Sequence, residues 1–533
     1  MSRNTNEISE KKSDLDFIKC GLDMDCEKQE PIKAEFTYEE ALVNIGFGRV
    51  QLYVLIVSGI CLMAVINETV GMSIISLSSL CDLETDTQKR AILSATGFIG
   101  IFLSSHMWGY LADTTGRRNV MMISVFISNV FSLLSMFASN YWLFVVLRFF
   151  SGVGISGPSA CVYAYIGEFN TNKYRPVITN YASFFVGLSN IFIPAVPWII
   201  LPNAEWSFSI FGWLDFRPWR LIILCYLLPG FIGACCLKKF IPESPRFFLA
   251  RGRDQEALDI IHWIYETNTG KPKETCEIKR LTPEATPEHI ESIANKKTCT
   301  EIIKSMWNQT APLFKPPYLL YYSMCCTVEF GLFFIGGMGL WYPEISNRLG
   351  NNEDSSSYVC EIIGESEKAH LVMDDFNVTM SRMLENCDDT IKTQTYFDTM
   401  TIGFVYVIGY VIIGFIINPL GRKAVLAMCI FGSGIAGLVL HWVNDPLTIV
   451  IAFALFIALP GLCISIIGGI VCDLIPTHLR GMAVCICLML GRFGSVVGSN
   501  VIGLLINTHC ILTFYLFSGF IIFCGVLTLF IPS

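Results

Sequence analysis

Charged residues are scarce in this sequence, and those present show no basic excess. Only 15% of the 533 residues are charged, and 37 lysines and arginines face 45 acids, which gives a formal charge of -8. Surfaces that bind nucleic acid are strongly basic. We therefore expect no nucleic acid among the partners of this protein.

The motifs of common catalytic and cofactor-binding sites are also missing. The sequence has no glycine-rich phosphate loop with its lysine, and its His and Cys residues do not cluster at metal-ligand spacing. We expect no catalytic residue, no cofactor and no metal, so the chain is not predicted to be an enzyme.

The first fifty residues lack the apolar stretch that a cleavable signal peptide requires. They are polar and mixed in charge, beginning MSRNTNEISEKKSDLDFIKC. We interpret 1–50 as a cytosolic amino-terminal segment.

Apolar residues dominate the rest of the chain, with 53% hydrophobic residues and a mean hydropathy of +0.53. A hydrocarbon core of about 30 Å needs roughly 20 apolar helical residues. An all-α integral membrane protein with twelve transmembrane helices is predicted, with the lipid bilayer as a partner. The predicted spans are 52–77, 91–112, 119–138, 142–167, 176–200, 219–238, 317–342, 396–417, 423–441, 447–472, 481–507 and 511–531.

Basic residues in the short loops favour one orientation. With a cytosolic amino terminus, the inner short loops hold seven basic residues and the outer ones four, in agreement with the positive-inside rule. Both termini are then cytosolic. The predicted parts are an amino-terminal six-helix bundle at 51–238, a cytosolic central loop at 239–316 and a carboxy-terminal six-helix bundle at 317–531. The sequence leaves open whether the membrane is the plasma membrane or that of an intracellular vesicle.

The outer loop at 343–395 differs from every other connection. It holds 11 acids and 4 bases, a balance of -7, and an N-glycosylation acceptor at Asn377. It also holds Cys360 and Cys387, for which we predict a disulfide bond because the outer side is oxidising. Two free thiols are the alternative.

Three residues of the first half have a like residue 305 positions later. The pairs are Gly116 with Gly421, Glu168 with Asp473, and Arg175 with Arg480. One common offset indicates a duplicated six-helix unit. We therefore predict two pseudo-symmetric bundles.

Several motifs resemble those of a known superfamily. The runs GYLADTTGRR at 109–118 and RFFSGVG at 148–154 resemble the loop and helix-four signatures of the major facilitator superfamily. PESPR at 242–246 resembles its sugar-porter branch. The runs FTYEEA at 36–41 and WYPEI at 341–345 resemble the synaptic vesicle glycoprotein 2 family and related organic-solute transporters. The resemblance implies the major facilitator fold and a protein that works as a monomer.

Two acids lie within predicted membrane helices, Glu68 in helix one and Glu329 in helix seven. Intramembrane acids are costly and commonly mark substrate paths or proton relays. The resemblance implies that both helices line the central path, so both acids are candidates for a substrate or proton site. Pairing with Arg148 or Arg492 to hold helices together is the alternative. The resembled family usually has a second acid where this chain has Val65.

Charges and glycines gather at the predicted cytosolic helix ends, where acids recur with bases in both halves. We predict that they form inter-helix latches, with simple topological anchoring as the alternative. Arg148 is predicted to be structural or gating. The latch candidates are Asp113, Gly116, Arg117, Arg118, Glu168, Arg175, Gly421, Arg422, Lys423, Asp473 and Arg480.

These features predict a secondary active transporter that moves a small organic solute, an organic ion or a sugar-like molecule, by alternating access. Coupling to a proton or another ion is left open. The alternative is a transporter-like membrane protein that transports little or nothing and binds partners through its glycosylated outer loop. A pore is disfavoured, because paired latches indicate alternating gates.

Overall fold

The computed structural model describes residues 35–210, 214–283, 299–350, 358–363 and 390–532. Within this part of the chain, twelve helical spans are long and apolar enough to cross a membrane, which confirms the predicted number. Asn377 and Cys387 lie outside the described residues, so glycosylation of Asn377 stays a prediction.

The amino-terminal half contains six of these spans, and its first span is formed by two consecutive helices. Asp86 and Asn140 accept hydrogen bonds from backbone amides of Lys89 and Leu143 at 2.7 and 2.9 Å, and so cap two of the helices. The helices are α3 (Arg49–Thr69) with α4 (Met72–Ser78), α5 (Thr87–Thr115), α6 (Arg117–Ser135), α7 (Tyr141–Glu168), α8 (Arg175–Ile200) and α9 (Pro218–Phe240).

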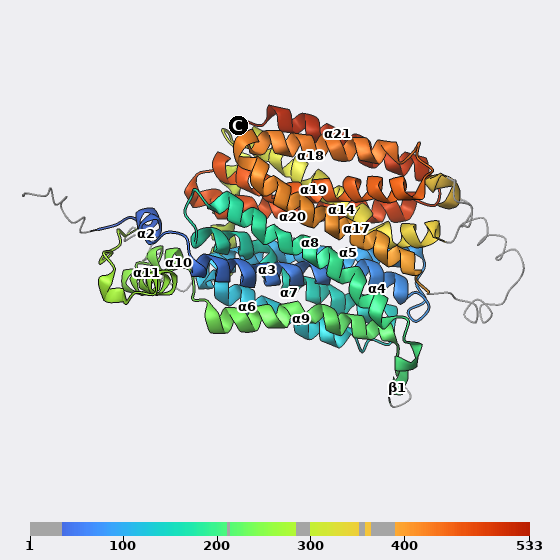
Figure 1. Ribbon diagram of the computed structural model, residues 1–533, viewed down its shortest axis with the longest axis horizontal. Helices are drawn as coiled ribbons and strands as arrows, with labels where there is room; N and C mark the ends of the chain where they lie inside the picture. Colours follow the sequence, from blue (N-terminus) through green and yellow to red (C-terminus); the bar gives the residue numbers. More distant parts are fainter. Residues whose placement is uncertain (1–34, 211–213, 284–298, 351–357, 364–389, 533) are drawn as a thin grey trace, which may run out of the picture.

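The carboxy-terminal half repeats this arrangement. Its long helices are α14 (Leu319–Leu349), α17 (Thr393–Leu420), α18 (Arg422–Val439), α19 (Pro446–Leu474), α20 (Thr477–Leu505) and α21 (Cys510–Phe530). In Figure 1 the helices of both halves run roughly along the long axis of the molecule, and the two sets lie beside each other.

The halves contact each other mainly through α5 with α20 and α8 with α17. Small residues allow the second contact: a Cβ on Gly187 would lie 2.8 Å from the backbone nitrogen of Val407, and one on Gly403 would lie 2.7 Å from that of Ile191. Asn180 adds a hydrogen bond of 2.8 Å to the carbonyl oxygen of Tyr410. Close backbone approach at small residues is typical of membrane helix pairs.

One end of the molecule, here called the α11 end, carries a small extramembrane unit (Figure 1). It combines α2 (Tyr38–Ile45) with α10 (Pro245–Leu249), α11 (Asp254–Thr269) and η2 (Lys273–Thr275). Asn268 of α11 accepts a hydrogen bond of 2.9 Å from the amide of Val50 and donates one of 3.0 Å to Gln51. Parts of the predicted segments 1–50 and 239–316 therefore fold against each other. Further along the chain lie α13 (Cys299–Thr310) and η3 (Ala311–Phe314).

The opposite end, here called the hairpin end, holds an element that the sequence reasoning did not predict. After η1 (Ala204–Trp206), strands β1 (Phe208–Ile210) and β2 (Leu214–Phe216) pair antiparallel between α8 and α9. The hairpin projects away from the helices (Figure 1).

The predicted disulfide between Cys360 and Cys387 is wrong. Cys360 is bonded to Cys510, the first residue of α21, 150 positions along the chain. The sequence reasoning considered only the two cysteines of the loop, whereas helix packing brings the start of α21 to the same end of the molecule. The bond ties the loop to the carboxy-terminal half.

Candidate functional site

A cavity of about 160 Å³ lies between the two halves. Its walls come from helices of both, including α3, α7 and α8 on one side and α14, α17, α19 and α20 on the other. Most lining side chains are apolar or aromatic, such as Val65 and Phe333, but nine carry a hydroxyl group, among them Tyr163, and Asn190 adds an amide. The cavity is thus a mainly apolar chamber with polar groups, at the interface of the bundles.

Arg492 of α20 is the one charged residue among the described residues that line this cavity. Its side chain reaches the other half: it donates hydrogen bonds to the hydroxyl of Ser105 at 3.2 Å, to the carbonyl oxygen of Ser159 at 3.0 Å and to the Ser159 hydroxyl. These hydrogen-bond partners carry no charge, and the nearby acid with which the guanidinium interacts electrostatically is Glu329 of α14.

Glu329 is buried within α14, close to the cavity wall. Among the described residues, neither of its carboxylate oxygens has a hydrogen-bond partner. It packs against α20 beside Arg492, where a Cβ on Gly491 would lie 2.9 Å from the Glu329 Cγ. Unpartnered buried carboxylates are rare in folded proteins, so Glu329 is a conspicuous feature of the site.

Glu68 has a different environment, inside the amino-terminal half. It forms an ion pair of 2.9 Å with Arg148 and accepts hydrogen bonds from Ser132 at 3.1 Å and from Ser151. Arg148 also donates to Ser132 at 2.5 Å. The pairing alternative for Glu68 therefore matches its contacts, and Arg148 joins α7 to α3 and α6.

The expectation that both acids face the central path does not hold in this conformation. Neither Glu68 nor Glu329 lines the cavity, whereas Val65, where the resembled family usually has an acid, does. One helical turn separates Val65 from Glu68, and α3 directs Glu68 toward α6 and α7 instead.

At the α11 end, the two halves contain equivalent ion pairs. Arg117 at the start of α6 pairs with Glu168 at the end of α7, and also with Asp113 at 3.3 Å. In the second half Arg422 pairs with Asp473. Each pair lies 305 positions from its counterpart, but each joins helices of one half. They are inter-helix contacts that do not bridge the two bundles, and their role as latches stays a prediction.

The glycines and the PESPR run complete the amino-terminal cluster. Gly116 has φ +101° and Gly421 φ +83°, backbone conformations that favour glycine. The backbone amide of Arg118 donates to Glu243 of the PESPR run and lies 3.1 Å from each of its carboxylate oxygens. The Arg118 side chain donates to the carbonyl oxygens of Leu237 and Lys238 at 3.0 and 2.9 Å. This links the loop after α5 to the end of α9.

The remaining latch candidates are placed as follows. Arg175 begins α8 and donates to the carbonyl oxygen of Gly167 at 3.0 Å. Lys423 is the second residue of α18. Arg480 lies in the first turn of α20, and its side chain is outside the described part of the structure.

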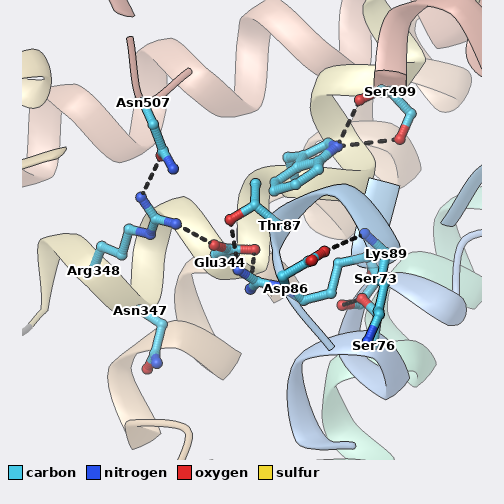
Figure 2. Close-up of polar contacts among 12 residues, drawn as sticks. Ser73, Ser76, Asp86, Thr87, Lys89, Glu344, Asn347, Arg348, Ser499 and Asn507 are labelled. Atoms are coloured by element: carbon cyan, nitrogen blue, oxygen red, sulfur yellow. Dashed lines mark hydrogen bonds and ion pairs between the residues drawn. The ribbon is translucent and has the colours of Figure 1, made fainter. Parts of the chain in front are cut away.

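The sequence reasoning missed a polar cluster at the hairpin end. Figure 2 shows Glu344, Arg348 and Asn507 joined there, near the start of α5. Arg90 of α5 forms an ion pair of 2.5 Å with Glu344 of α14. From the sequence, Arg90 is only one of the four basic residues of the outer short loops, and Glu344 is only a member of the WYPEI run.

Two family models match the chain. The model described as "Sugar (and other) transporter" matches residues 62–364, and that of the Major Facilitator Superfamily matches residues 388–533. Together they span both halves of the fold.

Curated relatives include synaptic vesicle glycoproteins. Synaptic vesicle glycoprotein 2B of Homo sapiens is 28% identical over 376 residues, covering 68% of this chain and 54% of the relative. Synaptic vesicle glycoprotein 2A of Rattus norvegicus is 28% identical over 330 residues, covering 58% and 44%. The chain thus spans about half the length of these relatives.

Solved structures with a similar fold include the xylose transporter XylE from E. coli. Its partially occluded inward-open form has a TM-score of 0.62 at 14% identity, covering 91% of this chain and 100% of that one. A structure titled as the proton:xylose symporter XylE bound to 6-bromo-6-deoxy-D-glucose has a TM-score of 0.61 at 15% identity, covering 91% and 96%. These likenesses confirm the predicted fold of two six-helix bundles. With its matching family model, this multi-pass membrane chain belongs to the sugar (and other) transporter family of the major facilitator superfamily.

Proposed function

We propose that this protein is a secondary active transporter that carries a small organic solute by alternating access. The observation that carries the proposal is the cavity enclosed by helices of both halves. A binding site between two related bundles can be exposed to either side of the membrane when the bundles rock. We assign the α11 end to the cytosol and the hairpin end to the opposite side, following the loop charges.

The cavity favours a particular class of solute. Its described lining has one formal charge, the guanidinium of Arg492, together with nine hydroxyl-bearing side chains, one amide, and aliphatic and aromatic walls. Guanidinium groups bind carboxylates and phosphates through paired hydrogen bonds. An organic anion with an apolar body fits this chemistry, because its charged group can pair with the guanidinium, which a neutral sugar cannot do.

Glu329 is the residue that we assign to coupling. Its carboxylate oxygens have no partner among the described residues, and Leu332 and Phe333 of the same helix line the cavity. Carboxyl groups in such positions commonly carry protons in transporters. The proton:xylose symporter of similar fold is consistent with this assignment.

The test is uptake into proteoliposomes with an imposed pH gradient. A panel of organic anions, organic cations and neutral sugars is offered to the wild type, and we expect gradient-driven uptake of an anion. Glu329→Gln should remove the response to the gradient while solute exchange across the membrane continues. Asp398→Asn is the matched control, because this buried carboxylate already accepts hydrogen bonds of 2.7 Å from Ser346 and Gln394.

Two outcomes would contradict the proposal. Unchanged gradient-driven uptake by Glu329→Gln would reject the coupling role alone. No uptake of any solute in the panel would favour the protein that binds partners through its outer loop. Deletion of residues 364–389, which leaves the Cys360–Cys510 bond in place, then tests that alternative: a receptor loses its partner. If uptake is detected in the panel, a carrier keeps it after the same deletion.

A further inference from the structure

An ion pair joins the two halves at the hairpin end. The Nη1 atom of Arg90, near the start of α5, lies 2.5 Å from the Oε2 atom of Glu344, near the end of α14. The side chains are only 9% and 11% exposed. Unlike the pairs at the α11 end, this one bridges the bundles.

The contacts around Glu344 belong to the carboxy-terminal half. Arg348 donates to its other oxygen at 2.5 Å and, through its second terminal nitrogen, to Asn507 at 3.0 Å (Figure 2). The guanidinium of Arg90 lies 6.0 Å from the ring centroid of Trp341, whose indole nitrogen donates to the carbonyl oxygen of Ser499 at 3.0 Å. Glu344 and Trp341 are thus held by contacts within the carboxy-terminal half. Arg90 contacts both of them from the amino-terminal half.

Close backbone packing occurs at the same place. A Cβ on Gly503 of α20 would lie 2.7 Å from the Cβ of Ala91 and 3.0 Å from the Trp341 ring. Ala91 follows Arg90 directly in α5. The helices therefore reach this distance only because residue 503 has no side chain.

We propose that Arg90 and Glu344 form the gate of the hairpin end, closed in this structure and opened each time the cavity is exposed to that side. The inference rests on the alternating access proposed above. Separation would expose both charges to water, and that hydration offsets the lost attraction. An interface with this balance can exist in two discrete states.

Amide hydrogen exchange of the full chain in lipid nanodiscs, read by mass spectrometry, tests the gate without any solute. Arg90→Gln should accelerate exchange in both 79–92 and 340–349 by about tenfold, because a largely buried acid loses its partner across the interface. Arg348→Gln is the matched control: it removes a partner of the same carboxylate but leaves Arg90 in place. It should accelerate exchange in 340–349 alone.

A second variant tests the gate without changing charge. Gly503→Ala inserts a methyl group between α5 and Trp341, so it should accelerate exchange in both segments as Arg90→Gln does. If Arg90→Gln fails to fold, Gly503→Ala tests the proposal in its place. The proposal would be overturned if either variant exchanged the amides of 79–92 at the wild-type rate. It would also be overturned if Arg348→Gln accelerated exchange there as much as Arg90→Gln does. A gate that responds as expected in a protein without detectable transport would reject only the proposed function.

Discussion

The guanidinium of Arg492 on α20 donates a hydrogen bond of 3.0 Å to the carbonyl oxygen of Ser159 on α7, across the boundary between the two halves. Arg492 is 5% exposed, and it lines the cavity. Because its hydrogen-bond partners are uncharged and Glu329 interacts with it without a hydrogen bond, a solute anion can pair with the guanidinium without breaking a hydrogen-bonded ion pair. A solute bound there would contact both halves at once.

Arg492→Met should therefore reduce uptake of an anionic solute by about tenfold or more, since hydrogen bonds to charged groups contribute about 1.5–3 kcal/mol. Arg492→Lys should be intermediate, because it keeps the charge but not the planar fork. Initial uptake rates in proteoliposomes measure the effect. Ser105→Ala, which removes one partner at 3.2 Å and keeps the charge, is the control. Wild-type uptake of the anion by Arg492→Met would contradict this role.

The repeat is the part of the site that the sequence predicted best. The 305-residue offset identified Glu168 and Asp473 as equivalent, and each of them pairs with the arginine at the start of the preceding helix of its half. Such pairs form between helices that are neighbours along the chain. Hydropathy and a repeat suffice to place them.

Contacts between distant segments could not be predicted in this way. Two examples are the ion pair of Arg90 with Glu344 and the disulfide of Cys360 with Cys510. Both depend on how the two bundles, and the helices within them, pack. Likewise, the rotation of α3 about its axis decides that Val65 faces the cavity while Glu68 faces Arg148. A helix that is apolar on all sides has no amphipathic pattern from which this rotation can be read.

Glu68→Gln should destabilise the protein, because it leaves the buried guanidinium of Arg148 without its acid. Removing one partner of a buried ion pair costs about 3–5 kcal/mol. We expect a lower unfolding temperature in detergent, measured by size-exclusion chromatography of samples heated to increasing temperatures. The double variant Glu68→Gln with Arg148→Met should recover part of the loss, since neither charge is then left alone. Thermal stability of Glu68→Gln equal to that of the wild type would show that the pair is not structural.

Gly498→Ala should destabilise the contact between α14 and α20. A Cβ at this position would lie against the backbone carbonyl oxygen of Phe334, closer than real Cβ atoms approach. Overpacking of this kind costs about 1–3 kcal/mol. Gly519→Ala is the matched control, because nothing lies within 4 Å of a Cβ there. The same heating assay should show a lower unfolding temperature for Gly498→Ala and an unchanged one for Gly519→Ala. Equal decreases would mean that the close contact at Gly498 does not determine the stability of the protein.

The two equivalent ion pairs at the α11 end should differ in strength because their burial differs. The side chains of Arg117 and Glu168 are 18% and 10% exposed, whereas those of Arg422 and Asp473 are 28% and 67% exposed. Arg117→Gln should cost about 3 kcal/mol, as expected when a largely buried acid loses its partner. Arg422→Gln should cost less than about 1 kcal/mol, as for a solvent-exposed pair.

Thermal unfolding at low and high salt separates these two cases. Salt screens exposed charges far more than buried ones, so the small effect of Arg422→Gln should disappear at high salt while that of Arg117→Gln persists. Equal losses for both variants would mean that the repeat, and not burial, sets the strength of these pairs. Because each pair lies within one bundle, neither variant should accelerate amide exchange at the hairpin end, in contrast to Arg90→Gln.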